Sequence, residues 1–231
     1  MPSLKSRKIG LRSSVAVTLL LLLSRPLYSG EILDRIVATV NGQIILLSDW
    51  QDAARYEAFI SQRPVGDLTV ADRKAVLDRL IDQELLREQM SAIDSPHCTP
   101  ESVNARLADI RKQYVEVKTQ SDWENLLHQY ELTEEQLKHH VENELNVLLL
   151  VDARLRPSVS VDAQSIESYY NQEILPQLRQ SGSAEKPLAQ LTPKIKEVLT
   201  QQKMNELLTA WLQNLRAGSD IRTSENAPQA Q

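Results

Sequence analysis

The sequence predicts a mainly α-helical fold that begins with a small β-hairpin. Residues 36–40 and 43–46 are short aliphatic runs, and both residues of the intervening Asn41-Gly42 tolerate the positive φ angles of a type I′ turn. Most of the remaining chain has apolar residues at helical spacing. Because an isolated hairpin is at best marginally stable in water, we expect the helices to cover it.

The first 29 residues have the pattern of a secretory signal peptide. Four basic residues precede a nine-residue apolar run at 15–23, and a passable cleavage site ends at Ser29. This run is too short to span a bilayer, which takes about 20 residues. We therefore expect cleavage, export to the periplasm, and no stable membrane insertion afterwards.

The charge of the chain limits the kinds of partner that it is expected to bind. Residues 1–29 hold five basic residues and no acidic one, so the rest has 21 basic and 31 acidic residues, a net charge of −10. This balance argues against nucleic acid and against anionic lipid surfaces as partners. Cys98 is the only cysteine, so the chain forms no intramolecular disulfide.

Capping patterns predict the first two helices. Ser48 opens a capping-box pattern that predicts a helix over about 49–61. A segment with proline and glycine, 63–67, ends this helix. Thr69 then caps a second amphipathic helix that extends to about Ala92.

Three more helices follow, each with a predicted N-cap. Thr99 is followed by Pro100, which suits the first helical position because its missing N–H is not needed there. Ser121 is the predicted cap of a short fourth helix, and Thr133 that of a fifth helix that ends before Pro157.

The C-terminal third predicts two further helical segments. Residues 162–172 form the first, and the polar segment 177–186 is expected to be a flexible loop. Thr192 and Pro193 predict the start of the last helix, and Gly218 is placed to end it in the left-handed conformation. A possible final strand follows at 219–223, and the polar tail 224–231 is expected to be disordered.

This arrangement resembles the N-terminal chaperone module of the SurA family. The residues that carry the resemblance are 34–42 (DRIVATVNG), Ile45-Leu46, Ser48-Asp49, 77–86 (LDRLIDQELL), 211–216 and Ile221-Arg222. The resemblance covers almost the whole chain after the signal and implies one chaperone domain over 30–223. It also implies that the closing helix and strand return to the N-terminal hairpin.

The chain departs from this family in one respect. Full-length members insert one or two parvulin-type prolyl isomerase domains before the closing helix, whereas only about twenty residues separate Asn171 from Pro193 here. A domain usually needs at least roughly 40 residues. The resemblance therefore implies a chaperone body without the isomerase.

The sequence offers no convincing catalytic, metal or cofactor site. His97 and Cys98 are neighbours in a Ser/Pro connector, where adjacent residues rarely share one ligand geometry. His139 and His140 are adjacent on a predicted helix, where they diverge by about 100°. Neighbouring carboxylates on the second and fifth predicted helices fit solvated or helix-dipole roles. No nucleophile elbow, phosphate loop or dinucleotide fingerprint occurs.

The large apolar residues of the first and fourth predicted helices have two interpretations. They could form core, or they could line a partly exposed groove for unfolded chains, which gains affinity from apolar area. The candidate groove residues are Tyr56, Phe59, Trp123, Leu127 and Tyr130.

The function expected from these observations is that of an ATP-independent periplasmic holdase, not an enzyme. Its partners would be unfolded or nascent envelope proteins, including outer-membrane proteins, and it would need no cofactor. Two alternatives remain: an adaptor dedicated to one envelope partner, and a prolyl isomerase by family association. The sequence does not indicate an oligomeric state.

Overall fold

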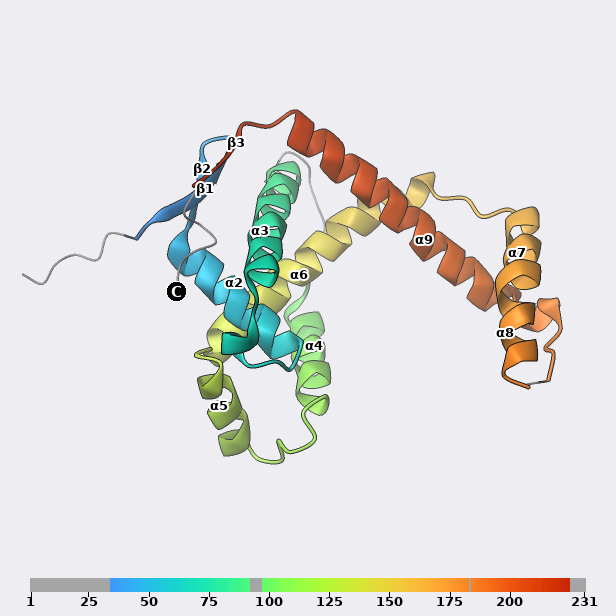
Figure 1. Cartoon of the computed structure of the whole chain (residues 1–231), viewed down its shortest axis with the longest axis horizontal. Coiled ribbons are helices and arrows are strands. Elements are labelled where there is room, and N and C mark those ends of the chain that lie inside the picture. The colour runs from blue at the N-terminus through green and yellow to red at the C-terminus, as the bar shows by residue number, and fades with distance from the viewer. Residues whose placement is uncertain (1–33, 92–96, 183, 225–231) are drawn as a thin grey trace, which may run out of the picture. The chain divides into compact units, whose positions relative to one another are not determined.

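The computed structural model describes residues 34–91, 97–182 and 184–224. The expected signal peptide, 1–29, and the expected tail beyond Ser224 lie outside these residues. The fold is mainly α-helical with one small antiparallel sheet, as the sequence predicts (Figure 1). Within the described residues, no helix has the length and apolar character needed to cross a membrane.

The sheet joins the two ends of the described chain. Strands β1 (Ile36–Val40) and β2 (Gln43–Leu46) form the predicted hairpin, and Asn41 and Gly42 have φ angles of 49° and 89°. Strand β3 (Ile221–Thr223) pairs antiparallel with the other edge of β1, which gives the strand order β2-β1-β3. The expected return of the C-terminal strand to the hairpin is therefore observed.

The first part of the core lies between the sheet and two helices, α2 (Leu47–Ile60) and α3 (Val70–Ser91). Trp50 is fully buried there, and its indole N–H donates to the carbonyl of Arg73 at 2.9 Å. The other buried members are Val37, Ala38, Val40, Ile45, Ala54, Ala58, Leu68, Val76, Leu77, Ile81 and Leu85. A short 3₁₀ turn, Val65–Asp67, connects the two helices.

The second part of the core is formed by the three helices that follow. These are α4 (Pro100–Lys112), α5 (Gln120–Gln129) and α6 (Glu134–Leu155), which pack around Phe59 at the end of α2. The hydroxyl groups of Thr99 and Thr133 cap α4 and α6 as predicted.

The C-terminal third begins with the 3₁₀ turn Arg156–Ser158. Helix α7 (Ala163–Tyr169) continues through a π-helical turn (Tyr170–Ile174) into α8 (Leu175–Gln180). The last helix is α9 (Leu188–Ala217). Helix α9 packs on α7 near its start and on α6 and α3 further along. The prediction of a flexible loop over 177–186 is wrong for residues 177–180, which belong to α8.

Two predicted N-caps are wrong. Helix α2 begins at Leu47, where the Asp49 carboxylate accepts the backbone N–H of Leu46 at 2.9 Å, while the Ser48 hydroxyl donates to Asp34 instead. Helix α5 is capped by Thr119, with Asp122 completing the capping box, and Ser121 is already inside the helix.

The predicted start of the last helix is also wrong, whereas its predicted end at Gly218 is confirmed. Helix α9 starts at Leu188, so Pro193 lies inside it, and the Thr192 hydroxyl donates to the Leu188 carbonyl at 2.9 Å rather than capping. Gly218 ends the helix as predicted, but at φ −92° and ψ 0° rather than in the left-handed conformation, and its N–H bonds to carbonyls of the last turn.

Candidate functional site

The residues proposed from the sequence as a groove divide between core and surface. Phe59, Trp123 and Leu127 are buried, with exposed fractions of 0%, 3% and 2%. The Phe59 ring stacks on Tyr114 at 5.1 Å and meets Trp123 and Tyr130 edge-on at 5.9 Å and 5.4 Å. Phe59, Trp123 and Leu127 are therefore core residues, as the first of the two interpretations predicts, and they offer no surface to a ligand in this structure.

Tyr56 is half-buried and belongs to a polar network. Its hydroxyl donates to Glu144 at 2.9 Å, and its ring stacks on His140 at 4.5 Å. Burial, reinforced by the Glu144 carboxylate, raises the pKa of the Tyr56 hydroxyl well above its ordinary value. Tyr56 is therefore a neutral donor that joins α2 to α6.

The network continues on the other side of His140. Its Nε2 lies 2.7 Å from Asp52 Oδ2, and Gln136 donates to the other Asp52 oxygen at 2.9 Å. No local sequence pattern predicts this contact, because Asp52 and His140 are 88 residues apart. The arrangement fixes α2 against α6.

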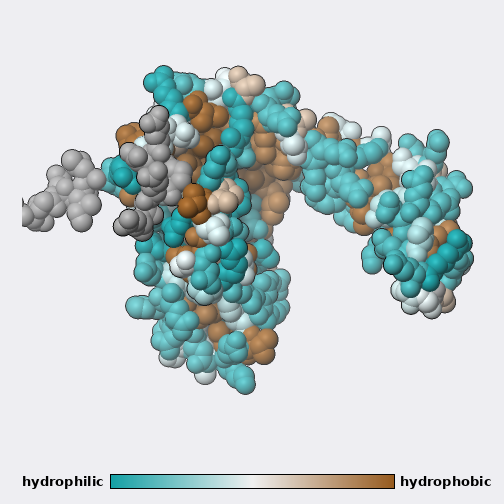
Figure 2. Space-filling view, viewed as in Figure 1, coloured by the Kyte–Doolittle hydropathy of each residue, from teal (hydrophilic) through white to brown (hydrophobic). Residues whose placement is uncertain are grey.

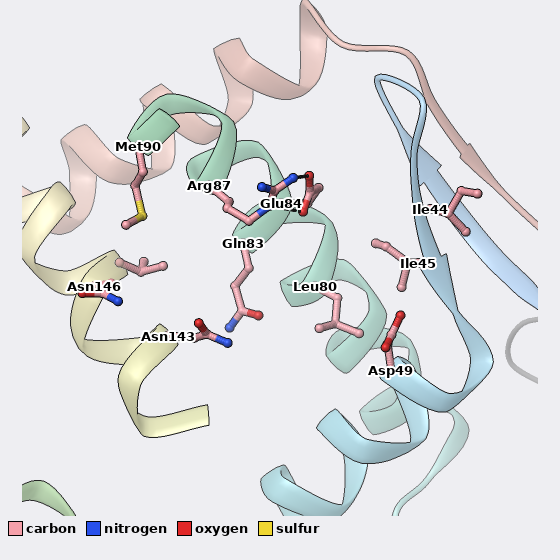
Figure 3. Close-up of a pocket in the computed structure, with 11 residues that line it drawn as sticks. Ile44, Ile45, Asp49, Leu80, Gln83, Glu84, Arg87, Met90, Asn143 and Asn146 are labelled. Carbon is pink, nitrogen blue, oxygen red and sulfur yellow. Dashed lines mark hydrogen bonds and ion pairs between the residues drawn. The ribbon is translucent and has the colours of Figure 1, made fainter. Parts of the chain in front are cut away.

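A cavity of about 260 Å³ lies on the surface of α3, between the hairpin and α6 (Figure 3). It is lined by Ile44, Ile45, Asp49, Leu80, Gln83, Glu84, Arg87, Met90, Asn143, Asn146 and Val147. Ile45 and Leu80 converge on one side of it, and Met90 lies on the other.

A second cavity of about 290 Å³ adjoins the first. It is lined by Ala53, Tyr56, Glu57, Ile60, Val76, Arg79, Leu80, Gln83, Arg106, His140, Asn143 and Glu144. Leu80, Gln83 and Asn143 border both cavities. The two cavities therefore adjoin at these three residues, and we refer to them together as the α3 groove.

Carboxamide groups lie at the middle of the α3 groove. Gln83 of α3 and Asn143 of α6 point toward one another in Figure 3, and Asn146 lies one turn further along α6. A carboxamide both donates and accepts hydrogen bonds, which matches the peptide group. Apolar side chains flank these amides on both sides, so the groove offers a polypeptide backbone partners as well as an apolar contact surface.

The arginines that line the groove are all neutralised by neighbouring carboxylates. Arg87 bonds to Glu84 through two nitrogens at 2.5 and 2.8 Å, and Arg79 lies 2.8 Å from Glu57. Arg106 approaches the Tyr56 partner Glu144 at 3.3 Å, which leaves the groove with little net charge.

The groove lining contains carboxylates, arginines, amides, one tyrosine and one histidine beside its apolar residues. Neither cavity has serine, threonine or cysteine in its lining. Among the described residues, no group of three or more His, Cys, Asp or Glu side chains is arranged to hold a metal ion. Cys98 lies outside the groove, half-buried, and burial raises the pKa of its thiol.

A scan against protein-family models finds no match to this chain, and a search of curated proteins finds no similar sequence. Function is therefore inferred from the geometry of the groove, together with the resemblance carried by the hairpin and the closing elements.

Proposed function

We propose that this protein is an ATP-independent chaperone of the periplasm that holds extended segments of unfolded envelope proteins in the α3 groove. The observation that carries the proposal is the groove itself, in which uncharged amides and paired charges lie among apolar side chains. The pairing of β3 with β1 supports it, because the resemblance to the SurA module implied this return of the C-terminus.

The lining of the groove fits recognition of a backbone rather than of one sequence. Gln83 and Asn143 would bond to peptide groups, which every client presents, while Leu80 and Met90 would contact whichever apolar side chains lie nearby. The paired arginines favour neither acidic nor basic clients. This arrangement suits capture of many unfolded chains.

The expected affinity is modest. Two or three client side chains buried on the groove contribute about 1.5–3 kcal/mol each. Ordering the flexible client opposes this gain. The sum is at most about 9 kcal/mol before this cost, whereas a micromolar dissociation constant needs about 8 kcal/mol after it. We therefore expect a dissociation constant weaker than about micromolar, which allows release without ATP.

A light-scattering assay tests the proposal. The contacts within the chain group Asp34–Gln231 as one compact unit, so the protein is prepared from Gly30 onward. A chemically unfolded client is diluted into buffer with this protein at a few-fold molar excess and no nucleotide. We expect aggregation to be slowed and its final level reduced. Unchanged aggregation relative to an inert protein of similar size contradicts the proposal.

Exposed leucines outside the groove favour a second candidate, an adaptor dedicated to one envelope partner. Leu148 of α6 and Leu207 of α9 are both exposed, although they lie on helices that contact each other. An affinity purification from envelope extract distinguishes the two candidates. A single stoichiometric folded protein would favour the adaptor, and a broad set of unfolded proteins would favour the holdase.

A further inference from the structure

Among the described residues, no strand pairs with the outer edge of β2, which lies beside the α3 groove. The strand order β2-β1-β3 leaves β2 at one side of the sheet. The N–H of Asn41 donates to Asp220, and the N–H of Ser224 donates to the carbonyl of Val37. The backbone N–H and C=O groups of the odd-numbered residues of β1 therefore point toward β3, and those of the even-numbered residues point toward β2.

This alternation fixes the direction of the polar groups of β2. Val40 and Ala38 of β1 oppose Gln43 and Ile45, which therefore form the hydrogen-bonded pairs. Ile44, between them, points its N–H and C=O away from β1. No contact within the described part of the chain occupies these two groups.

The two outer edges of the sheet differ in how they are protected. β3 carries Arg222 at its centre, with a side chain that is 77% exposed, and a charge at an edge discourages pairing with another chain. β2, with the sequence QIIL, has neither a charge nor a proline, and Ile44 is 54% exposed. Only the β2 edge is therefore suited to receive another strand.

We propose that a client pairs with β2 as an added β-strand, through hydrogen bonds to the backbone of Ile44. This inference rests on the proposed function and specifies the client. Client side chains on the same face of the sheet as Ile45 would lie toward Leu80 in the groove. The alternate client side chains would lie on the opposite face, with Ile44 (Figure 3).

The occupant follows from the charge and spacing of the site. The paired arginines of the groove give no net attraction for a charged segment. The alternation of strand side chains calls for an apolar residue at every second position. The client is therefore an extended, uncharged segment of alternating apolar and polar residues, a pattern typical of membrane β-barrel strands.

Backbone methylation of a peptide tests the added strand directly. The probe is a fluorescein-labelled peptide of roughly ten residues, the upper length of most strands, with alternating Val and Thr. One version carries N-methyl groups on the Val amides and another on the Thr amides. Only one edge of the peptide can face β2, so we expect one version to lose about tenfold in affinity, as the loss of the bond to the Ile44 carbonyl and the bulk of the methyl group imply, and the other to keep its affinity.

Two results of this experiment contradict edge pairing, and they separate it from the proposed function. Equal affinities, or equal losses, for the two methylated peptides overturn the added strand even if the unmodified peptide binds and client aggregation is suppressed. If the unmodified peptide does not bind and aggregation is also unchanged, the proposed function itself fails.

Substitution of Ile44 provides the matching test on the protein. Ile44→Pro removes the outward N–H, and proline is tolerated at an edge strand where this group faces solvent. Ile44→Thr keeps the N–H and a β-branched side chain. We expect about tenfold weaker peptide binding for Ile44→Pro and less than about threefold for Ile44→Thr, with both variants folded by circular dichroism. Equal effects of the two substitutions contradict the proposal.

A second copy of the chain is the competing occupant of the β2 edge. Sedimentation of the wild-type protein and of Ile44→Pro distinguishes it. We expect a monomer that forms a complex with the peptide. A dimer that the Ile44→Pro substitution converts to monomer would overturn the proposal, because the edge would then belong to self-association.

Discussion

Asn41 at the tip of the hairpin also binds the C-terminal segment. Its φ angle of 49° is in the left-handed region, which asparagine adopts more readily than most residues. Its side-chain amide donates to Glu88 at 2.8 Å and to Ser219 at 3.2 Å, and its oxygen accepts the Asp220 N–H at 2.9 Å. One residue therefore forms the turn and holds β3 in place.

Substitutions at Asn41 separate these two roles. Asn41→Gly keeps the backbone conformation and loses the side-chain bonds, so we expect it to lower the unfolding free energy by about 1 kcal/mol. Asn41→Ala also forces alanine into the left-handed region, which adds about 1–2 kcal/mol. Urea denaturation measures both. An alanine variant as stable as the glycine variant would contradict this account.

The carboxylate of Asp72 makes the start of α3 sensitive to acid. The Arg63 guanidinium, with hydrogen bonds from the Thr69 N–H and hydroxyl, holds the pKa of Asp72 well below its ordinary value of 3.8. Because the folded-state pKa is lowered, the stabilisation is present above the unfolded pKa and is lost as the pH falls below it.

The Asp72→Asn variant tests this pH dependence. We expect the wild-type protein to be more stable than the variant by a constant amount above about pH 5, and this difference to shrink as the pH falls below about 3.8. Urea midpoints measured across this range check the result. A stability difference that does not change between neutral and acidic pH would show that the ionised Asp72 is not the cause.

Local chemistry explains which caps the sequence predicts correctly. Thr69, Thr99 and Thr133 each bond to a backbone N–H within three residues, so the pattern is sufficient. Ser48 is different, because its hydroxyl binds Asp34, 14 residues away. A single-sequence pattern contains no information on such a competing partner.

At the scale of elements, the end of α9 and strand β3 clasp the N-terminal part of the chain. Arg216 donates to Asp82 at 2.6 Å and to the Asp78 carbonyl at 2.8 Å, which joins α9 to α3. Ile221, opposite Val40, then adds its side chain to the first part of the core. The hairpin therefore depends on residues almost 180 positions away.

Truncation tests the clasp. Ending the chain after Ala217 removes β3 together with Ser219 and Asp220, the C-terminal partners of Asn41, and we expect the thermal midpoint to fall by about 5 °C or more. The matched control ends after Ser224 and keeps every residue of β3, so its midpoint should lie within about 1 °C of the wild-type value. Equal midpoints for the two truncations would mean that β3 contributes nothing to stability.

The packing of the C-terminal elements explains why the start of α9 was mispredicted. Pro193 predicted a helix start, yet Leu191, before it, lies with Tyr169 and Leu178 around a small cavity between α7, α8 and α9. The Tyr170 hydroxyl also donates to the Lys186 carbonyl at 2.7 Å. Tertiary packing thus extends α9 toward its N-terminus despite the hydrogen bond that proline cannot make.

At the scale of the whole molecule, the sequence predicted the fold better than the site. Hairpin, helices and closing strand follow from turn residues, caps and periodicity, all of which are local. The candidate aromatics converge in the core, because Phe59, Trp123 and Tyr130 come from two helices and an adjoining cap that pack together. Periodicity marks a residue as apolar but does not show whether another helix covers it.

Of the candidate groove residues only Tyr56 lines the α3 groove, and the rest of its lining had no comparable signal. Leu80, Gln83 and Met90 are at ordinary boundary positions of an amphipathic helix, where apolar and polar residues meet. What makes them a groove is that α6 and the hairpin stand on either side without covering them (Figure 3). Figure 2 shows apolar residues among hydrophilic ones on the surface of this part of the chain. Such an arrangement depends on contacts between distant segments.

The most direct measurement of the central claim compares two tryptophan substitutions on α3 in the client aggregation assay. Gln83→Trp places a large ring where the two cavities meet, whereas Lys74→Trp places it at an exposed position that lines neither cavity. We predict that Gln83→Trp loses most of the suppression of client aggregation and that Lys74→Trp keeps it, with both variants folded. Equal suppression by the two variants would contradict the α3 groove as the client-binding site.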